Sequence, residues 1–335
     1  MFKHIVGAFL GCLLSVSPLV AADLRIATFN TESDPHFSTD PVNVARTISE
    51  MGKFDILALQ EVEDADAVKQ YAEAAAHSLK GTWRSIISES GVNFDRKSDH
   101  LAIIYRSDLF RQIDTRELHM IRSNTGAGPY GKTDWSLRGA LALRLQHTGG
   151  QEIQVVTVHL KCCGGEGVAI RTHQSNVLAA EIDTERFPTI VLGDTNIPIE
   201  PGQPAPDVAN LPTFTNLTTG MGLKWVAPSN PVATQCSPQF NSMLDQIYGP
   251  PNAAASAEIK FPEQAYCDRE NAGYADHRPI VATFPGLLAE TVTLASPAIT
   301  DEEPVVAPAG DSEAMLEARE SALQQIIRPG DVNAE

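Results

Sequence analysis

The sequence lacks the local motifs that mark several large enzyme classes. It contains no glycine-rich phosphate loop, no nucleophilic serine elbow and no dinucleotide-binding fingerprint. Its five cysteines do not show the paired spacing of a structural zinc site. Beyond the N-terminus, no apolar run is long enough to cross a bilayer. Any catalytic function must therefore depend on polar residues that are scattered along the chain.

The chain is also poor in positive charge. It has 25 lysine and arginine residues against 42 acidic residues, which gives a formal net charge of −17 at pH 7. The segment from Gly286 to the C-terminus is strongly acidic, and the remaining part is acidic as well. A tight nucleic-acid binder is expected to carry a basic patch. The composition therefore argues against high-affinity DNA binding, but it is compatible with an enzyme that turns over phosphate esters.

The N-terminal residues have the pattern of a secretory signal peptide. Lys3 gives a positive start, residues 5–16 are mostly apolar, and Val20-Ala21-Ala22 has the small residues of a cleavage site. We expect a cleaved signal peptide over residues 1–22 and a secreted or periplasmic protein. A membrane anchor is disfavoured because serines and a proline interrupt the apolar run. Lipidation at Cys12 is an alternative that we rank below simple cleavage.

The cysteines that remain after signal-peptide cleavage are Cys162, Cys163, Cys236 and Cys267. Export would place them in an oxidising compartment. An even number of cysteines in an oxidising compartment favours disulfide bonds, although the sequence does not give the pairing. Because neighbouring cysteines rarely bridge to each other, we expect Cys162 and Cys163 each to pair elsewhere. Free buried thiols are the alternative.

Strand-like and helix-like segments alternate up to about residue 284. Capping residues and amphipathic patterns predict helices over residues 40–51, 64–79 and 168–182. Between and after these helices, strands are predicted at residues 83–87, 101–106, 116–121, 139–145, 153–159 and 189–193. Several consecutive strands without intervening helices indicate mixed sheets rather than pure parallel winding.

The sequence predicts one catalytic domain with an appendage. The domain is expected over residues 23–286, and an acidic tail rich in proline and alanine follows over residues 287–335. We expect the tail to be poorly ordered or loosely docked. A glycine-rich loop over residues 122–134 is a candidate lip of a site.

Polar residues with catalytic potential follow several apolar runs of strand type. They are Asn30, Glu61, His159, Asp194 with Asn196, and Asp276 with His277. Each alone has an ordinary explanation, such as a turn asparagine, a solvated carboxylate or an edge histidine. A side chain at the end of a buried strand, however, has the rigid support that an accurately built site needs. Hard oxygen ligands together with two histidines indicate a divalent-cation hydrolase.

The order and local context of these segments resemble the endonuclease/exonuclease/phosphatase superfamily, which has the DNase I-like fold. The resemblance covers residues 24 to 284 and rests on Ala27-Thr28-Phe29-Asn30, Leu59-Gln60-Glu61-Val62, Val156-Thr157-Val158-His159-Leu160-Lys161, Leu192-Gly193-Asp194-Thr195-Asn196, Leu244-Asp245-Gln246-Ile247 and Asp276-His277-Arg278-Pro279. It implies an α/β fold, a four-layer α/β/β/α sandwich with two packed mixed β-sheets, and a site at one rim.

The resemblance also implies a role for each matching residue around the metal. Glu61 would be the main ligand of Mg²⁺ or Mn²⁺, and Asn30 would lie beside it or bind phosphate. Asp276 would contribute to the same metal region, since Mg²⁺ prefers oxygen ligands. Asp194 would orient or deprotonate the attacking water, and Asn196 would hold a phosphate oxygen.

Two histidines complete the implied site. His277 would contact the scissile phosphate, and Asp245 would fix its tautomer and orientation. His159 would bind or protonate the leaving group. We hypothesise that Asp99 pairs with His159, although a surface aspartate fits this position equally well. Arg138 is a candidate ligand of a substrate phosphate and equally a rim charge.

Two features depart from the DNase I branch of the family. Glu63 stands where that branch has an arginine that reaches the minor groove, and its negative charge would repel DNA. The loop at Cys162-Cys163 is similar to bacterial secreted members instead. That resemblance leads us to expect that Cys162 or Cys163 bridges Cys236 or Cys267.

The sequence therefore predicts a secreted, Mg²⁺- or Mn²⁺-dependent phosphoesterase that hydrolyses phosphodiesters, with nucleic acid as the leading substrate class. A sphingomyelinase-type lipid phosphodiesterase and an inositol-type small-molecule phosphatase are alternatives. A catalytically silent binding module on the same fold is the alternative from another class, but the metal and histidine positions are intact. We expect a monomer without a stable protein partner.

Overall fold

The computed structural model describes residues 22–33, 39–91, 99–122 and 137–288, which all belong to one compact unit. Residues 1–21 of the predicted signal peptide, nearly all of the predicted lip and the acidic tail from residue 289 lie outside the described residues. Among the described helices, none combines the length and the apolar character that a membrane span requires.

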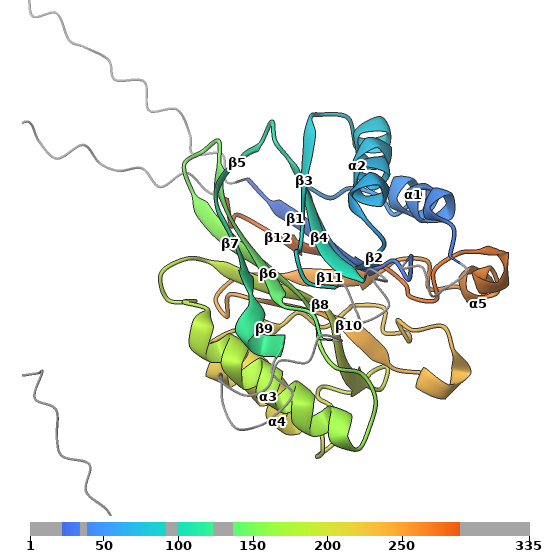
Figure 1. Cartoon of the computed structure of the whole chain (residues 1–335). Helices are drawn as coiled ribbons and strands as arrows, with labels where there is room; N and C mark the ends of the chain where they lie inside the picture. Colours follow the sequence, from blue (N-terminus) through green and yellow to red (C-terminus); the bar gives the residue numbers. More distant parts are fainter. Residues whose placement is uncertain (1–21, 34–38, 92–98, 123–136, 289–335) are drawn as a thin grey trace, which may run out of the picture. The chain divides into compact units, whose positions relative to one another are not determined.

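In this described part, the strands form two six-stranded mixed sheets (Figure 1). The first sheet has the order β11-β12-β1-β2-β4-β3 and the second has the order β5-β6-β7-β8-β10-β9. The strands are β1 (Leu24–Asn30), β2 (Ile56–Val62), β3 (Trp83–Ile87), β4 (His100–Arg106), β5 (Phe110–Leu118), β6 (Ala140–His147), β7 (Glu152–His159), β8 (Thr189–Ile199), β9 (Lys224–Trp225), β10 (Met243–Gly249), β11 (Ser256–Ile259) and β12 (Ile280–Phe284).

Helices cover the outer faces of both sheets. They are α1 (Pro41–Glu50), α2 (Ala65–Leu79), α3 (Glu166–Glu181) and α4 (Leu211–Thr215), whereas α5 (Gln264–Cys267) lies in the connection between β11 and β12. Figure 1 shows α1 and α2 on the outer side of the first sheet, and α3 and α4 on the outer side of the second. The unit is therefore the four-layer α/β/β/α sandwich that the sequence predicted.

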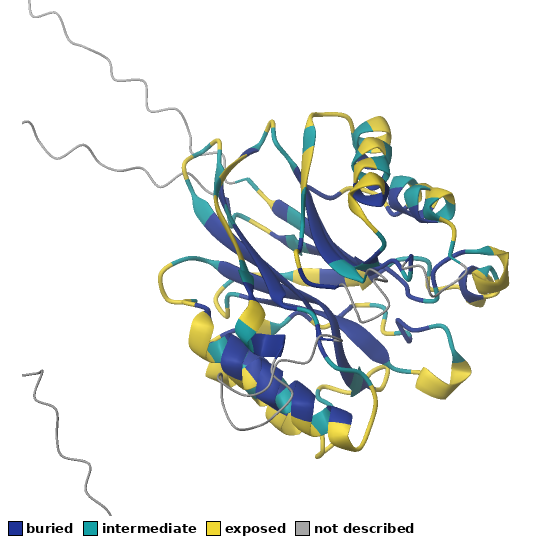
Figure 2. Cartoon of the chain, viewed as in Figure 1, coloured by how far each residue is buried: buried dark blue, intermediate teal, exposed yellow. Residues whose placement is uncertain are grey.

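Alternating side chains explain why the first sheet is buried on both faces. Ile26 of β1 and Ile103 of β4 pack in the core between the sheets, against Leu143 of β6. The next residue along each strand, Ala27 or Ile104, belongs to the separate core under α1 and α2. This is the two-residue period of a strand. In Figure 2 the strands are mostly dark blue, while the outward surfaces of the helices are yellow.

The predicted start residues of the first two helices are confirmed. Asp40 caps α1 by accepting from the Val42 amide at 2.9 Å. Asp64 caps α2 by accepting from the Ala67 amide, also at 2.9 Å. Each carboxylate satisfies one of the amide groups that a helix start leaves without a partner. The third helix, α3, begins at Glu166 and so starts earlier than the sequence predicted.

Two strand predictions are wrong in extent. The strand predicted over residues 116–121 begins at Phe110, because β5 pairs with β6 from there to Leu118. Residues His119–Arg122 form a 3₁₀ helix instead. The strand predicted over residues 189–193 continues to Ile199, because β10 pairs with this extension as well. Asp194 and Asn196 therefore lie inside β8 and not after its end.

Two parallel strand pairs bring the candidate residues to one rim. Asn30 at the end of β1 lies beside Gln60 of β2. His159 at the end of β7 lies beside Asp194 of β8. Parallel neighbours run in the same direction, so their carboxyl ends meet at the same edge. The Gln60 amide donates to the Thr157 hydroxyl at 2.9 Å and ties the two sheets together just below this edge.

Irregularities in the ladders aim two of the side chains. The pairing of β2 with β4 shifts register between Leu59 and Val62, and Glu61 has φ +54° there. The pairing of β8 with β10 shifts at Asp194, and Asn196 has φ +52°. Left-handed backbone is uncommon outside glycine, and bulges of this kind often redirect side chains beside active sites.

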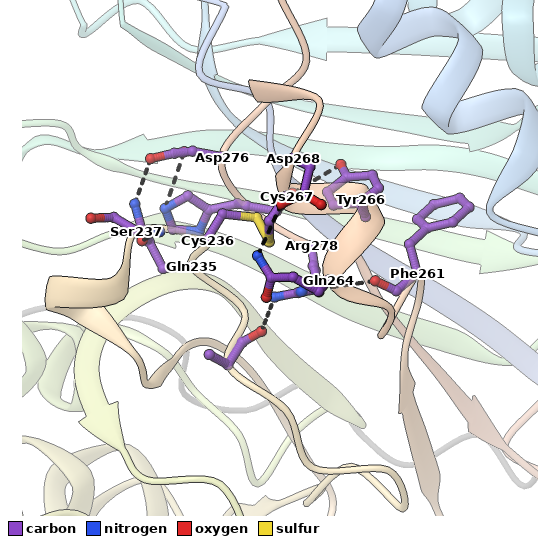
Figure 3. The surroundings of a disulfide bond; sticks show 12 residues. Gln235, Cys236, Ser237, Phe261, Gln264, Tyr266, Cys267, Asp268, Asp276 and Arg278 are labelled. Carbon is purple, nitrogen blue, oxygen red and sulfur yellow. Dashed lines mark hydrogen bonds and ion pairs between the residues drawn. A yellow bond between two sulfur atoms is a disulfide. The ribbon is translucent and has the colours of Figure 1, made fainter. Parts of the chain in front are cut away.

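A disulfide bond joins Cys236 and Cys267, with a sulfur–sulfur distance of 2.02 Å (Figure 3). The Cys236 amide donates to the Asp276 carbonyl oxygen, so the bridge supports the segment that carries Asp276 and His277. The expectation that Cys162 or Cys163 takes part in this bridge is wrong. Cys236 lies in the segment between β9 and β10 and Cys267 ends α5, and both segments lie near the Asp276–His277 segment before β12, whereas Cys162 and Cys163 follow β7 and have free thiols.

The glycine before Asp194 is required by a close backbone approach. Gly193 has φ +140°, and a Cβ at this position would lie 2.1 Å from the Val158 carbonyl oxygen. We expect Gly193→Ala to lower the free energy of unfolding by about 1–3 kcal/mol or more, because β7 and β8 would have to separate. Chemical denaturation measures this loss.

Gly164→Ala is the matched control, since a Cβ there meets nothing within 4 Å. Equal stability of the two variants would contradict the close approach of β7 and β8 at Gly193.

Candidate active site

The rim carries one cavity into which most of the predicted residues project. Its lining includes Glu61, His159, Asp194, Asn196, Asp276 and His277, together with Glu32, Gln235 and Arg171, which were not predicted. The side chains of His159, Asp194 and His277 are at least nine-tenths buried. Charges that are removed from water in this way interact strongly with one another, so the arrangement of these groups decides their protonation.

Two carboxylates form the centre of the site. The Asn30 amide nitrogen donates to Glu61 Oε1 at 2.9 Å and to Asp194 Oδ2 at 3.2 Å. Burial raises the pKa of Asp194 to about 7, with a further contribution from the charge of Asp245. Burial and the charge of Asp99 also raise the pKa of Glu61 well above its ordinary value. Asn30 therefore holds the two acidic groups at one point.

His277 and Asp245 form the predicted pair. His277 Nδ1 lies 2.7 Å from Asp245 Oδ2, and both side chains are buried. Burial alone would lower the pKa of His277, but the carboxylates of Asp245, Asp276 and Asp194 outweigh it and raise that pKa well above its usual value. With Nδ1 bonded to Asp245, the ring presents Nε2 to Asp194 at 3.9 Å and to Asp276 at 3.8 Å.

His159 has a different environment from the one hypothesised. Asp99 Oδ1 lies 3.9 Å from His159 Nδ1, too far for a hydrogen bond. Arg138 lies between them: its Nη2 is 2.8 Å from Asp99 Oδ2 and also contacts His159 Nδ1. Asp99 thus lies near His159 at ion-pair distance, but the Arg138 guanidinium makes the shorter contact with each of them. Arg138, a candidate phosphate ligand, is itself held by Asp99.

The protonation of His159 follows from these neighbours. Burial and the positive charge of Arg138 hold the pKa of His159 well below its usual value. Arg138 Nη2 contacts Nδ1 and also lies 3.2 Å from Nε2, and because Nδ1 is the closer atom, a neutral ring with its proton on Nε2 fits this contact best. This atom lies 3.4 Å from Asp194 Oδ2 and 3.6 Å from Glu61 Oε1. One histidine of the site is thus neutral, and the other is protonated.

Asn196 is placed beside the carboxylate cluster by its own backbone. Its amide N–H donates to Asp194 Oδ1 at 2.9 Å, and its side-chain nitrogen donates to the Leu160 carbonyl oxygen at 3.1 Å. Bonds of the first kind are typical of Asx turns. The turn therefore orients Asp194 and links β8 to the residue that follows His159.

The Asp276 side chain lines the cavity beside His277, and two residues that were not predicted contact this part of the chain. Gln235 Nε2 donates to Asp276 Oδ2 at 2.5 Å, as Figure 3 shows. The Glu32 carboxylate accepts from the Asp276 amide at 2.9 Å. Burial and the charge of Asp276 raise the pKa of Glu32 to about 8. Glu32 follows Asn30 closely, but only its left-handed φ of +46° turns it into the site.

The donor set fits a divalent cation. One oxygen or nitrogen atom from each of Glu61, His159 and Asp194 lies within 4.8 Å of the others, and Asp194, Asp245 and His277 form a second such group. Asp245 and His277 already bond to each other, and the His159 ring contacts Arg138, so the carboxylate oxygens of Glu61 and Asp194 are the atoms best placed to hold a cation. Burial and neighbouring carboxylates raise the pKa values of Glu61 and Asp194, and a bound cation would favour the charged forms of both groups.

Cation binding is therefore expected to stabilise the protein. Mg²⁺ or Mn²⁺ at about 100 times its dissociation constant should raise the free energy of unfolding by about 2.7 kcal/mol. The melting temperature of the chelator-treated protein should therefore rise when the cation is added back. Glu61→Gln should abolish most of this gain and stabilise the metal-free protein, because it removes one of the repelling charges.

Glu73→Gln serves as the control, because Glu73 is an exposed carboxylate on α2. A cation-induced gain in Glu61→Gln as large as that in Glu73→Gln would contradict the assignment of Glu61.

Comparison with known proteins gives matches at the level of structure. No protein-family model matches the chain, and no curated protein sequence matches it either. An endonuclease/exonuclease/phosphatase from Bacteroides vulgatus has a TM-score of 0.56 at 16% identity, over 78% of this chain and 98% of its own. ANGEL2, described as a 2′,3′-cyclic phosphatase, has a TM-score of 0.55 at 17% identity, over 79% and 96%.

A third match is a mannosyl-6-phosphatase from Bacteroides thetaiotaomicron. It has a TM-score of 0.51 at 17% identity, over 77% of this chain and 98% of its own. Such identities establish a shared architecture and leave the chemistry to be argued from the residues. The chain therefore has the DNase I-like fold of the endonuclease/exonuclease/phosphatase proteins.

Proposed function

We propose that this protein is a divalent-metal-dependent phosphoesterase that hydrolyses phosphodiester bonds, with nucleic acid as the leading substrate class. The observation that carries the proposal is the meeting, in one cavity, of the His277–Asp245 pair, neutral His159 and the crowded carboxylates of Glu61 and Asp194. The structural neighbours described as a 2′,3′-cyclic phosphatase and a mannosyl-6-phosphatase support phosphoester chemistry on this architecture.

The residues divide the work that hydrolysis of a phosphoester requires. Glu61 would anchor the cation, which when bound neutralises charge on the phosphoryl oxygens. Asp194 would orient the attacking water and take its proton, and a pKa of about 7 suits a base that works near neutral pH. Asn30 keeps Asp194 beside Glu61.

The two histidines have complementary protonation states. Protonated His277 would donate from Nε2 to a non-bridging phosphate oxygen, since Asp245 occupies Nδ1. Neutral His159 would offer its Nε2 proton to the leaving oxygen, since Nδ1 accepts from Arg138. Both rings are fixed by a bond to the other nitrogen, which is the usual way in which proteins select a histidine tautomer.

We also propose that the protein works outside the cytosol. The N-terminal residues have the composition of a signal peptide, and the Cys236–Cys267 bridge suits an oxidising compartment.

Hydrolysis of bis(p-nitrophenyl) phosphate with Mg²⁺ or Mn²⁺ tests the function. His277→Ala should lower kcat by about 10²–10³-fold, the range for the loss of one donor to charge that develops in the transition state, and chelation should abolish turnover. His77→Ala, an exposed position on α2, is the matched control. Full turnover in His277→Ala would refute the role of His277.

A substrate panel with the native protein addresses a second question. Turnover of DNA, RNA, sphingomyelin or a sugar phosphate would identify the substrate class.

The pH profile tests the pairing of His277 with Asp245. If protonated His277 is required, activity falls as pH rises through its pKa. Asp245→Asn removes the negative charge that raises this pKa, so the alkaline limb of kcat should move to lower pH. Asp207→Asn changes another carboxylate of the cavity, which bonds to Asn210 instead, and should leave the limb unchanged. An unmoved limb in Asp245→Asn would contradict the pairing.

A further inference from the structure

The wall of the cavity contains two adjacent thiols that the proposed hydrolysis does not use. Cys162 and Cys163 lie between β7 and α3, directly after the His159 strand, and both line the cavity. Their sulfur atoms are 2.6 Å apart. A disulfide bond is about 2.0 Å long, so only a small shift separates these atoms from bonding distance. The partial exposure of Cys162 and the full exposure of Cys163 make the pair accessible to reagents.

The backbone around the pair brings the two side chains together. Cys163 has φ +74°, a left-handed conformation that is uncommon for a residue with a side chain and that is often retained at functional positions. The next two residues, Gly164 and Gly165, have open space where a side chain would be. The loop can therefore accommodate a change at the sulfur atoms without a collision at the glycines.

A buried arginine holds this backbone in place. Arg171 of α3 donates from Nη1 to the carbonyl oxygens of Lys161 at 2.5 Å and Cys163 at 3.1 Å. Its Nη2 donates to Asn210 Oδ1 at 2.6 Å. The Arg171 side chain is only 1% exposed, so these bonds are made away from water, where they are strong. The Cys162–Cys163 geometry is thus fixed by the fold.

We propose that Cys162 and Cys163 are a reversible modification site, a vicinal dithiol that closes to a disulfide in the cavity wall. The oxidant class is a low-molecular-weight disulfide such as oxidised glutathione. The Cys163 thiolate attacks one glutathione sulfur, which forms a mixed disulfide and releases one glutathione thiolate. The Cys162 thiolate then displaces the second glutathione, so two protein thiols are oxidised and one external disulfide is reduced.

The order of these two steps follows from exposure. Cys163 is the exposed sulfur of the pair. Burial, with a contribution from the neighbouring Cys163 thiol, raises the pKa of Cys162 to about 11, so Cys163 is the thiol that reacts first. The Cys236 and Cys267 sulfurs are already bonded to each other, so they do not compete for this reaction.

Peptide mapping tests the proposal without reference to activity. Cleavage after Lys161 and Arg171 places both cysteines in one tryptic peptide, residues 162–171. After equilibration of the full chain with oxidised glutathione, we expect this peptide to lack two hydrogen atoms and to resist alkylation, and mild reduction should restore two alkylatable thiols. Two free thiols or two glutathione adducts at equilibrium would overturn the proposal.

A thiophilic probe tests the reduced form. Phenylarsine oxide joins two neighbouring thiols through one arsenic atom with loss of water, so the reduced protein should bind one equivalent and the oxidised protein none. Cys163→Ser should abolish binding, and its melting temperature checks that the variant is folded. Binding that persists in Cys163→Ser, or that is absent from the reduced native protein, would overturn the dithiol assignment.

Discussion

The crowding of buried negative charge around Asp194 is the constraint on which the site depends. Asp194 lies beside Glu61 through the shared Asn30 amide, beside His159 through strand pairing and beside Asp245 through β10. Burial disfavours the charged form of a carboxylate, and together with the neighbouring charges of Asp245 and Asp99 it raises the pKa values of Asp194 and Glu61 respectively. A cation or a bound proton is needed to compensate these buried negative charges. Such a cluster is typical of a reactive centre and not of a structural core.

The opposite protonation of the two histidines comes from the same arrangement. His277 is surrounded by acidic side chains, which raise its pKa, whereas His159 faces the Arg138 guanidinium, which lowers it. Environment thus assigns one ring as a cation and the other as a neutral donor, although both are the same residue type. Pairs of groups whose pKa values are pushed apart in this way are characteristic of sites that need an acid and a base at one pH.

The two halves of the site are supported by different means. Hydrogen-bonded sheets hold Asn30, Glu61, His159 and Asp194, and the Gln60–Thr157 bond ties these sheets together. Asp276 and His277 lie on an irregular segment before β12, where the Cys236–Cys267 bridge and the Gln235 side chain supply the support that a sheet would give. The free pair at Cys162 and Cys163 lies on the sheet-supported side, so the two cysteine pairs serve separate parts of the rim.

From the sequence alone, capping residues determined the first two helix starts, and the resemblance of its motifs to a known superfamily implied the fold class and named most of the residues that line the cavity, because capping and short motifs are local properties. Only the tertiary structure decided the cysteine pairing, the insertion of Arg138 between Asp99 and His159, and the place of Glu32. These depend on which loops meet in space and on left-handed backbone at Glu32, Glu61 and Asn196. At Glu61 and Asn196 this backbone coincides with bulges in the strand ladders, and at Glu32 it follows the end of β1; no local pattern in the residues records it.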